Sequence, residues 1–243
     1  MRSFAIAIQF LTRIPIRLQH APNQKEIGLS LNYYPLVGLL LGVLLYALTL
    51  LMHSLPVMLS AALITVFWTL ITGGLHLDGL ADSADAWIGG IGDSSKTLSI
   101  MKDPACGPAG VVSIVLVLLV KFAAIYSLLQ INATLLIILA PALARTLVML
   151  LVSLTPYVRE QGLGSALKAH AKPSQHIVIA SLLSVVLVIV LGVVIVPIIV
   201  LQAVLFFILR FAMMRRLQGI TGDLAGAALE ISEVTVLISL LVI

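Results

Sequence analysis

Long apolar stretches alternate with short polar segments along most of the 243-residue chain. Each stretch is close to the ~20 apolar residues with which a helix crosses the hydrocarbon core of a bilayer. An all-α, polytopic membrane protein with about seven transmembrane helices is therefore expected. The seven stretches cover residues 34–52, 57–72, 111–129, 134–154, 177–196, 198–214 and 224–243.

The first 16 residues show a different pattern, in which apolar and polar positions alternate with a helical period. Arg13 and Arg17 lie near the end of this segment. A short amphipathic helix that ends in cations suits the surface of a membrane, so we expect residues 1–16 to lie at the interface, against phospholipid head groups. Its apolar face is formed by Phe4, Ala7, Ile8 and Leu11.

The charge pattern gives the expected orientation in the membrane. Lys and Arg gather before residue 34 and in segments 87–108, 156–175 and 215–222, whereas the turns near residues 55, 131 and 197 carry none. Because Lys and Arg concentrate in cytoplasmic loops, these segments are expected inside, with the N-terminus inside and the C-terminus outside. The net charge of +4 is spread over several loops, so no nucleic acid partner is expected.

Composition supports the membrane assignment and shows no sign of a second domain. Hydrophobic residues make up 61% of the chain and charged residues 10%, compared with about 25% charged residues in soluble domains. No internal repeat or low-complexity segment divides the sequence, so residues 1–243 are expected to form a single integral-membrane domain. The sequence does not decide the number of subunits, and a homo-oligomer stays open.

Three aspartates stand out within residues 73–87, GGLHLDGLADSADAW. On a helix Asp78, Asp82 and Asp85, at i, i+4 and i+7, share one stripe. Neighbouring carboxylates repel unless a cation lies among them, and Mg²⁺ is the natural partner of oxygen ligands. His76 could accept a proton nearby, although a helix would direct it away from the stripe. The alternative is a solvated, purely structural helix face.

A second acidic segment, TGDLAGAALE, covers residues 221–230. Asp223 and Glu230 have the same i, i+7 separation as Asp78 and Asp85. Small residues between them permit close helix packing in a membrane, so we predict that these two acids share the metal site of the first segment. A packed Gly/Ala seam with two incidental acids is the alternative. Glu233 lies roughly 80° from Asp223 around an ideal helix and is left out of the prediction.

Several cations are candidates for binding phosphate. Lys102 and Asp103 occupy a loop rich in Pro and Gly, in which the cation could bind phosphate and the carboxylate a ligand or metal. Arg145 falls in the middle of a predicted span and must point inward; it either pairs with carboxylates or grips an anionic ligand. Arg159 offers a bidentate fork for phosphate.

Carboxylates, glycines and a few cations at the ends of membrane helices favour phosphoryl transfer with a divalent metal. An ion- or proton-coupled transporter is the rival class, because acids on broken helices bind coupling ions there. Transporter carboxylates usually lie near the midplane of the membrane. The acids of this chain are expected at the cytoplasmic ends of the spans, which favours an enzyme.

Four runs closely resemble, in order and spacing, the cobalamin (5′-phosphate) synthase family, also called adenosylcobinamide-GDP ribazoletransferase. FLTRIP at residues 10–15 fits as well. The resemblance implies a bacterial inner (cytoplasmic) membrane enzyme, with its active site facing the cytoplasm, that transfers cobinamide phosphate from adenosylcobinamide-GDP to α-ribazole or its 5′-phosphate. Mg²⁺ is the implied cofactor and GMP the second product of this late step of cobalamin biosynthesis. The four runs are GGLHLDGLADSADAW, MKDPACGPAG (101–110), REQGLG (159–164) and TGDLAGAALE.

By this resemblance Asp78 is the first aspartate of the family motif. The hypothesis is that Asp78 and Asp82 hold Mg²⁺ on the pyrophosphate of the donor, while a carboxylate or His76 takes the proton of the attacking hydroxyl. The remaining acidic positions of the family are Asp85, Asp103, Asp223 and Glu230, and the residues expected to neutralise phosphate charge are Lys102, Arg145 and Arg159.

The nearest alternative among enzymes is an alcohol phosphotransferase of phospholipid synthesis, which acts on CDP-activated alcohols. That family also places an Asp-Gly motif at the mouth of membrane helices, and it continues the motif as Asp-Gly-x-x-Ala-Arg. Here Asp82 and Ser83 stand at the alanine and arginine positions. The sequence therefore favours the cobalamin synthase family.

Overall fold

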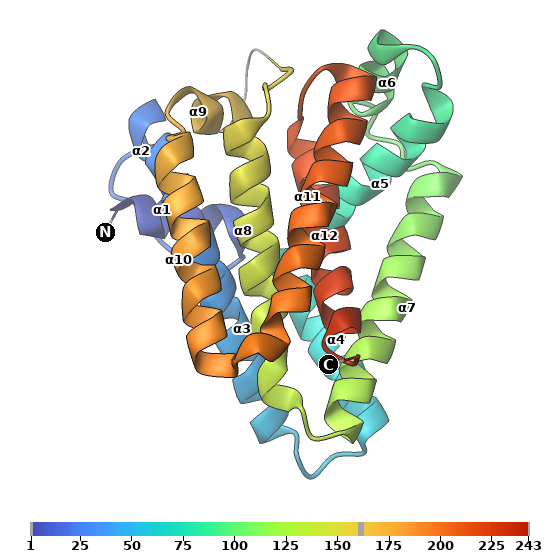
Figure 1. The fold of residues 1–243 in the computed structure, drawn as a ribbon. Coiled ribbons are helices and arrows are strands. Elements are labelled where there is room, and N and C mark those ends of the chain that lie inside the picture. Colours follow the sequence, from blue (N-terminus) through green and yellow to red (C-terminus); the bar gives the residue numbers. More distant parts are fainter. Residues whose placement is uncertain (1, 160–162, 243) are drawn as a thin grey trace.

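The computed structural model describes residues 2–159 and 163–242, and these residues form helices joined by short connections (Figure 1). The predicted all-α class is confirmed. The first half of the chain contains α1 (Arg2–Leu11), α2 (Gln24–Ser30), η1 (Leu31–Tyr33), α3 (Tyr34–Leu51), α4 (Val57–Thr72), α5 (Leu75–Gly89) and α6 (Ser94–Ile100). The second half contains α7 (Pro108–Gln130), η2 (Thr134–Ile138), α8 (Leu139–Leu154), α9 (Leu163–Ala169), α10 (Pro173–Leu191), η3 (Val193–Ile195), α11 (Val196–Leu217) and α12 (Gly222–Ser239).

The long helices run side by side, and the polar connections gather at one end of the bundle. Figure 1 places α2, α6 and α9 at its upper end, whereas the turns after α3, α7 and α10 and the C-terminus lie at the lower end. Within the described residues, five helical segments are long and apolar enough to cross a membrane, which confirms a polytopic membrane protein. These segments are Gln24–Leu51, Pro108–Gln130, Thr134–Leu154, Pro173–Leu191 and Val193–Leu217.

The predicted number of about seven spans is too high by this measure. The second predicted span, α4, is followed by a bend of 87° and then α5, and the pair adds a sixth candidate only if it counts as one span. The seventh, α12, packs inside the bundle against α5, α7 and α8. It carries three acidic residues, Asp223, Glu230 and Glu233, and is not among the candidate spans.

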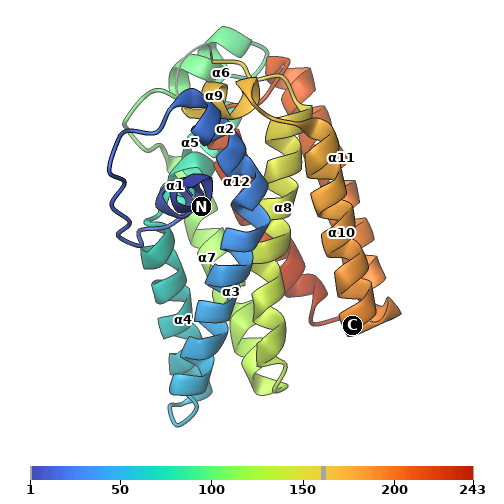
Figure 2. The ribbon, with the colours of Figure 1, turned by 90° about the vertical axis from the view of Figure 1, so that its left-hand side faces the viewer.

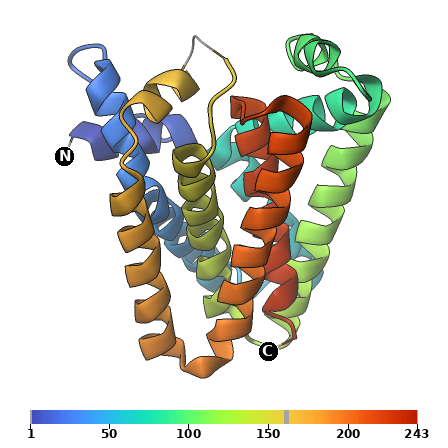
Figure 3. The same ribbon diagram turned by 45° about the horizontal axis from the view of Figure 1, so that its top comes forward.

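Two glycines produce the bend between α4 and α5. Gly73 and Gly74 both have positive φ, at 69° and 68°, a conformation that costs glycine little and other residues more. The bend turns α5 across the end of the bundle, apart from the five candidate spans, and Asp78 at its start is exposed. In Figure 3 the teal α5 crosses beside the red α12 at the upper end.

The turn before α11 differs from the prediction. It lies at Gly192, with φ of 78°, and not at Pro197. Pro197 instead occupies the first turn of α11, where its missing N–H would have no intrahelical partner. The fifth and sixth predicted spans therefore meet about five residues earlier than the sequence indicated.

The predicted N-terminal helix forms over residues 2–11 and does not extend to residue 16, and its apolar face is not left for lipid. Ala7, Ile8 and Leu11 are buried, and α1 packs against α2 and α3. Phe4 lies beside Tyr33, with 5.7 Å between ring centroids. Figure 2 shows α1 lying against the bundle near α2. The amphipathic pattern therefore reports contact with the protein core.

Candidate functional site

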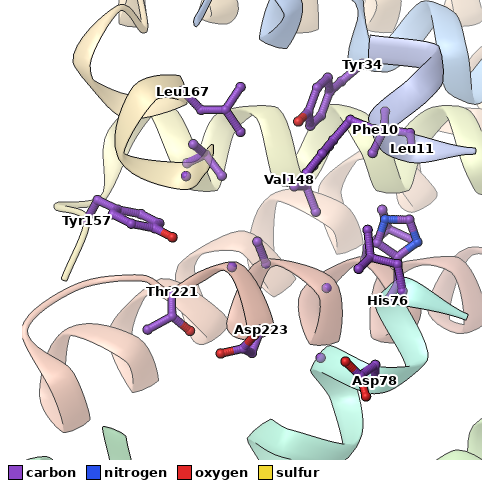
Figure 4. A pocket seen from close by; sticks show the side chains of 18 of the residues that line it. Phe10, Leu11, Tyr34, His76, Asp78, Val148, Tyr157, Leu167, Thr221 and Asp223 are labelled. Atoms are coloured by element: carbon purple, nitrogen blue, oxygen red, sulfur yellow. The ribbon is translucent and has the colours of Figure 1, made fainter. Parts of the chain in front are cut away.

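A cavity of about 270 Å³ lies between α1, α3, α5, α8, α9 and α12 at the upper end of the bundle (Figure 4). Its mouth is polar: Asp78 is exposed and Asp223 partly exposed. Its interior is buried and mostly apolar. The other polar residues of the mouth are Tyr157, Arg159 and Thr221, and the interior is formed by Phe10, Leu11, Tyr34, His76, Val148, Val152 and Leu167.

Close packing of α5 on α12 brings the two acidic segments together, as predicted. A Cβ on Gly79 would lie only 2.8 Å from the backbone oxygen of Asp223, and one on Gly226 would lie 3.3 Å from the backbone of His76. Glycine at both positions therefore allows the backbones to touch. Asp78 and Asp223 each lie in the first turn of their helix, where the helix dipole stabilises negative charge.

Four carboxylates form what we call the acidic cluster: Asp78, Asp82, Asp85 and Asp223. Burial and then the negative charges of Asp78, Asp223 and Asp85 raise the pKa of Asp82 to about 6, against the opposing effect of Arg159. Charge repulsion at Asp82 shows that the cluster has an excess of negative charge. A cation bound there would relieve this repulsion.

Asp85 also accepts hydrogen bonds from the backbone of a second helix, α7. Its Oδ2 accepts a hydrogen bond from the N–H of Gly107 at 2.7 Å, and its Oδ1 accepts one from the N–H of Gly110 at 2.9 Å. These N–H groups lie at the start of α7, where backbone donors have no partner within the helix. A carboxylate there accepts their hydrogen bonds and interacts favourably with the helix dipole. Asp85 therefore fixes α5 to α7.

Arg159 reaches the mouth of the pocket from the connection between α8 and α9. Its Nη2 donates to Asp223 Oδ2 at 2.7 Å. The connection is held in place by an isolated β-bridge between Tyr157 and Ile220, in which the N–H of Ile220 donates to the oxygen of Pro156 at 2.8 Å. The predicted phosphate-binding arginine thus lies at the pocket. Residues 160–162 of the REQGLG run lie outside the described residues.

Lys102 and Asp103 lie next to the pocket but do not line it. Both are exposed, and Asp103 Oδ1 accepts a hydrogen bond from the N–H of Ala105 at 2.9 Å. The preceding carbonyl, of Met101, accepts a long hydrogen bond of 3.4 Å from Arg159. The loop is therefore adjacent to the arginine, and Lys102 is free to meet a ligand that extends beyond the mouth.

His76 points into the interior of the pocket, away from Asp78 (Figure 4). Its side chain is 5% exposed, and neither ring nitrogen has a hydrogen-bond partner among the described residues. Burial lowers the pKa of His76 to about 3, with Arg145 as the next cause, so the imidazole is neutral. The sequence correctly placed it off the aspartate stripe.

Arg145 and Glu230 belong to a different group of charges, deep in the bundle. Arg145 Nη1 lies 2.6 Å from Glu233 Oε1, and Lys121 Nζ lies 2.8 Å from Glu230 Oε2 and 2.7 Å from Glu233 Oε2. Lys121 also lies 4.5 Å from the ring centre of Trp68. We call Lys121, Arg145, Glu230 and Glu233 the buried ion cluster.

The buried ion cluster changes two of the sequence predictions. Glu230 was expected among the metal ligands, but Lys121 already neutralises it, so we assign it to the buried ion cluster and not to the acidic cluster. Arg145 was expected either to pair with carboxylates or to bind phosphate, and the structure shows pairing, with Glu233. The sequence argument missed Glu233, although a carboxylate within a span requires a partner as much as Arg145 does.

A profile of the cobalamin-5-phosphate synthase family matches residues 3–241, almost the whole chain. The chain belongs to this family. The resemblance expected from the sequence motifs is thereby confirmed.

Members of this family from several bacteria are similar to the chain over nearly their full length. A protein of Pseudomonas syringae pv. syringae named adenosylcobinamide-GDP ribazoletransferase is 49% identical over 242 residues, 99% of each chain. Proteins of the same name from Pseudomonas fluorescens and Acinetobacter baumannii are 48% and 45% identical, and each alignment covers at least 96% of either chain. No solved structure gives a significant match.

The acidic cluster of this family member fits Mg²⁺ by its chemistry. All its donors are carboxylate oxygens, and burial and mutual repulsion at Asp82 favour a cation. Within residues 2–159 and 163–242, no three acidic, histidine or cysteine side chains converge on one metal position. Mg²⁺ commonly needs only one or two protein carboxylates, because water and substrate phosphates complete its octahedron.

Proposed function

We propose that the chain catalyses the reaction named for its relatives, adenosylcobinamide-GDP ribazoletransfer, as a late step of cobalamin biosynthesis. Its substrates would be adenosylcobinamide-GDP and α-ribazole or α-ribazole 5′-phosphate, and its products adenosylcobalamin or its 5′-phosphate and GMP. The observation that carries this proposal is 49% identity over 99% of the chain to a ribazoletransferase. A pocket with an acidic mouth, in the segment that contains the family motif, supports it.

The acidic mouth suits the pyrophosphate of the donor once a metal is present. Asp78 and Asp82 of α5 are the residues that would hold Mg²⁺, and Asp223 of α12, paired with Arg159, would lie beside it. Bound there, Mg²⁺ would offset the negative charge of the phosphates and of the leaving GMP. Arg159, which donates to Asp223, and the exposed Lys102 would contact phosphate oxygens directly.

The bond changes follow from the two substrates. A ribose hydroxyl of the acceptor forms a bond to the phosphorus that carries cobinamide, and the bond from that phosphorus to the bridging oxygen breaks. GMP leaves with the bridging oxygen. The hydroxyl proton passes to a carboxylate of the acidic cluster. His76 points away from Asp78 and is better placed to contact the acceptor.

This reaction would take place at the cytoplasmic face of a bacterial inner membrane. The polar connections around the pocket carry most of the Lys and Arg residues, as the positive-inside rule expects of a cytoplasmic face. The protein is a multi-pass membrane protein, and the whole chain would form the single transferase domain. Lipid would surround the exposed apolar faces of helices such as α10 and α11.

Family membership favours this activity over the two alternatives. An ion-coupled transporter would need an open ionic site inside the bundle, whereas the charges there are paired in the buried ion cluster. A phospholipid phosphotransferase would need the Ala-Arg continuation that Asp82 and Ser83 replace.

The full-length protein, purified in detergent or in nanodiscs, provides the direct test. Incubation with adenosylcobinamide-GDP, α-ribazole 5′-phosphate and Mg²⁺ is expected to release GMP and form adenosylcobalamin 5′-phosphate, both detected by chromatography. Omission of the acceptor or addition of EDTA is the control and is expected to abolish both products. Folded protein that forms neither product would refute the proposed activity.

A further inference from the structure

The interior of the pocket contains two buried polar side chains without partners. Tyr34 is 1% exposed and His76 5% exposed. The Tyr34 hydroxyl and both His76 ring nitrogens have no hydrogen-bond partner among the described residues. In Figure 4 the Tyr34 hydroxyl is directed into the pocket. Buried polar groups are normally satisfied, so these two are the positions at which a bound ligand would supply hydrogen bonds.

Around these two groups the interior walls are apolar and partly aromatic. Val148, Val152 and Leu167 form one side, and Phe10 lies beside Tyr34 with 6.3 Å between ring centroids. Such walls suit a flat ring with few polar atoms. The interior thus differs from the mouth, which is suited to phosphate and metal.

The size of the cavity narrows the choice of ligand. Pockets for drug-sized ligands have volumes of about 300–1,000 Å³. A cavity of about 270 Å³ accepts a heterocyclic base but not the corrin macrocycle, which must remain outside. If the proposed function holds, two bases compete for the interior: the guanine of the donor and the benzimidazole of the acceptor.

The number of polar groups distinguishes the two bases. Guanine carries three acceptors (O6, N7 and N3) and an amino donor on its edges, in addition to a ring N–H, and each would need a partner once buried. A dimethylbenzimidazole nucleoside has one free ring nitrogen in the plane, and the rest of its edge is apolar. Among the described residues of the interior, only the Tyr34 hydroxyl and the His76 ring nitrogens are buried polar atoms without a partner, so the benzimidazole is the better match.

We propose that the interior binds the benzimidazole base of the acceptor nucleoside, with the Tyr34 hydroxyl as hydrogen-bond donor to the free ring nitrogen and His76 as a second polar contact. This inference rests on the proposed function and assigns to Tyr34 the selection of the acceptor base. A base held there leaves its ribose at the mouth, beside Asp78 and Asp223, where the attacking hydroxyl is needed.

Tyr34→Phe removes the hydroxyl and keeps the ring. We expect the KM for α-ribazole 5′-phosphate to rise about 10-fold, as for loss of one buried hydrogen bond, while the KM for adenosylcobinamide-GDP stays unchanged. Tyr46→Phe, on the same helix and away from the pocket, is the matched control and is expected to change neither constant. An acceptor analogue with an indole has C–H in place of the free ring nitrogen. Its KM should exceed that of α-ribazole 5′-phosphate in wild type and should equal it in Tyr34→Phe.

A second variant tests whether the base binds in the interior, by filling that space with a larger side chain. Val152→Phe fills the interior and is expected to abolish binding of α-ribazole, measured by calorimetry on the full-length protein without donor or Mg²⁺. Folding is checked by retained binding of adenosylcobinamide-GDP. If either variant instead raises the KM for adenosylcobinamide-GDP alone, the interior holds guanine and the inference is wrong. An unchanged KM for both substrates in Tyr34→Phe also overturns it. Failure of the wild-type protein to release GMP would refute the proposed function itself. That result is distinct from the variant results, which test only the inference about the interior.

Discussion

Arg145 of α8 donates a hydrogen bond to Glu233 of α12 at 2.6 Å, and both side chains are completely buried. Lys121 of α7 completes the arrangement by pairing with Glu233 and Glu230. Two cations and two anions thus join three helices inside the bundle. A buried ion pair does not guarantee net stability, but removal of one partner leaves an uncompensated charge.

Lys121→Met is therefore expected to destabilise the protein strongly. Glu230 would lose its only ion-pair partner within the described residues, and the expected cost is about 3–5 kcal/mol. Thermal unfolding in detergent, followed by circular dichroism, measures the effect. Lys96→Met, at an exposed position, is the control and should change stability by less than about 0.5 kcal/mol. The double variant Lys121→Met/Glu230→Leu should recover much of the loss; no recovery would contradict the ion-pair explanation.

The acidic cluster could be predicted from sequence because local rules govern it. The i, i+4, i+7 spacing placed Asp78, Asp82 and Asp85 on one face, and the small residues of 221–230 correctly indicated a close helix contact. Both features depend on residues within one or two helical turns. The bend at Gly73 and Gly74 that turns α5 across the bundle was not predicted, although glycine adopts positive φ readily.

Which charged side chains pair with one another in the buried ion cluster could not be predicted from sequence. Glu230 and Glu233 lie on one helix, and which of them faces Lys121 depends on where α7 and α8 pack around α12. The interior of the pocket was missed for the same reason. Tyr34 lies 42 positions before His76, and only tertiary packing brings α1 and α3 over α5. A polar side chain at the start of an apolar span is too common a pattern to indicate a ligand.

The two groups of carboxylates are expected to respond differently to Mg²⁺. Asp78→Asn removes a proposed ligand and should lower turnover by about 100-fold or more and raise the Mg²⁺ concentration needed for half-maximal GMP release. Glu230→Gln keeps the shape of a residue outside the acidic cluster, so its Mg²⁺ dependence should match wild type. Glu26→Gln, on α2, controls for lost surface charge. If Glu230→Gln required more Mg²⁺ than wild type and Glu26→Gln did not, Glu230 would be a metal ligand and its assignment to the buried ion cluster would be wrong.

Contact between α5 and α12 should be sensitive to a single methyl group. Gly79→Ala would place a Cβ 2.8 Å from the backbone oxygen of Asp223, which cannot move without shifting the helix. Overpacking of this kind costs about 1–3 kcal/mol, and the activity should fall because Asp78 and Asp223 are separated. Gly89→Ala, on the same helix, meets only the end of the flexible Ile100 side chain and is the matched control. Equal effects at the two positions would contradict the close contact.

Arg159 is expected to act on the donor and not on the acceptor base. Arg159→Ala removes the partner of Asp223 and a proposed phosphate contact, so the KM for adenosylcobinamide-GDP should rise about 10-fold or more. The KM for α-ribazole should change little, which is the opposite of the result expected for Tyr34→Phe. Steady-state GMP release at varied donor and acceptor concentrations separates the two constants. Arg215→Ala, an exposed arginine at the end of α11, controls for loss of positive charge.

The single cysteine of the chain can test the orientation in the membrane. Cys106 is exposed in the connection before α7, on the same end of the bundle as the pocket. If that end faces the cytoplasm, a membrane-impermeant maleimide should label Cys106 in inside-out vesicles but not in intact spheroplasts. The variant Cys106→Ala/Ser54→Cys moves the thiol to the exposed turn after α3, at the opposite end, and should show the reverse pattern. Labelling of Cys106 in intact spheroplasts would place the pocket outside the cytoplasm, where the positive-inside rule does not put it.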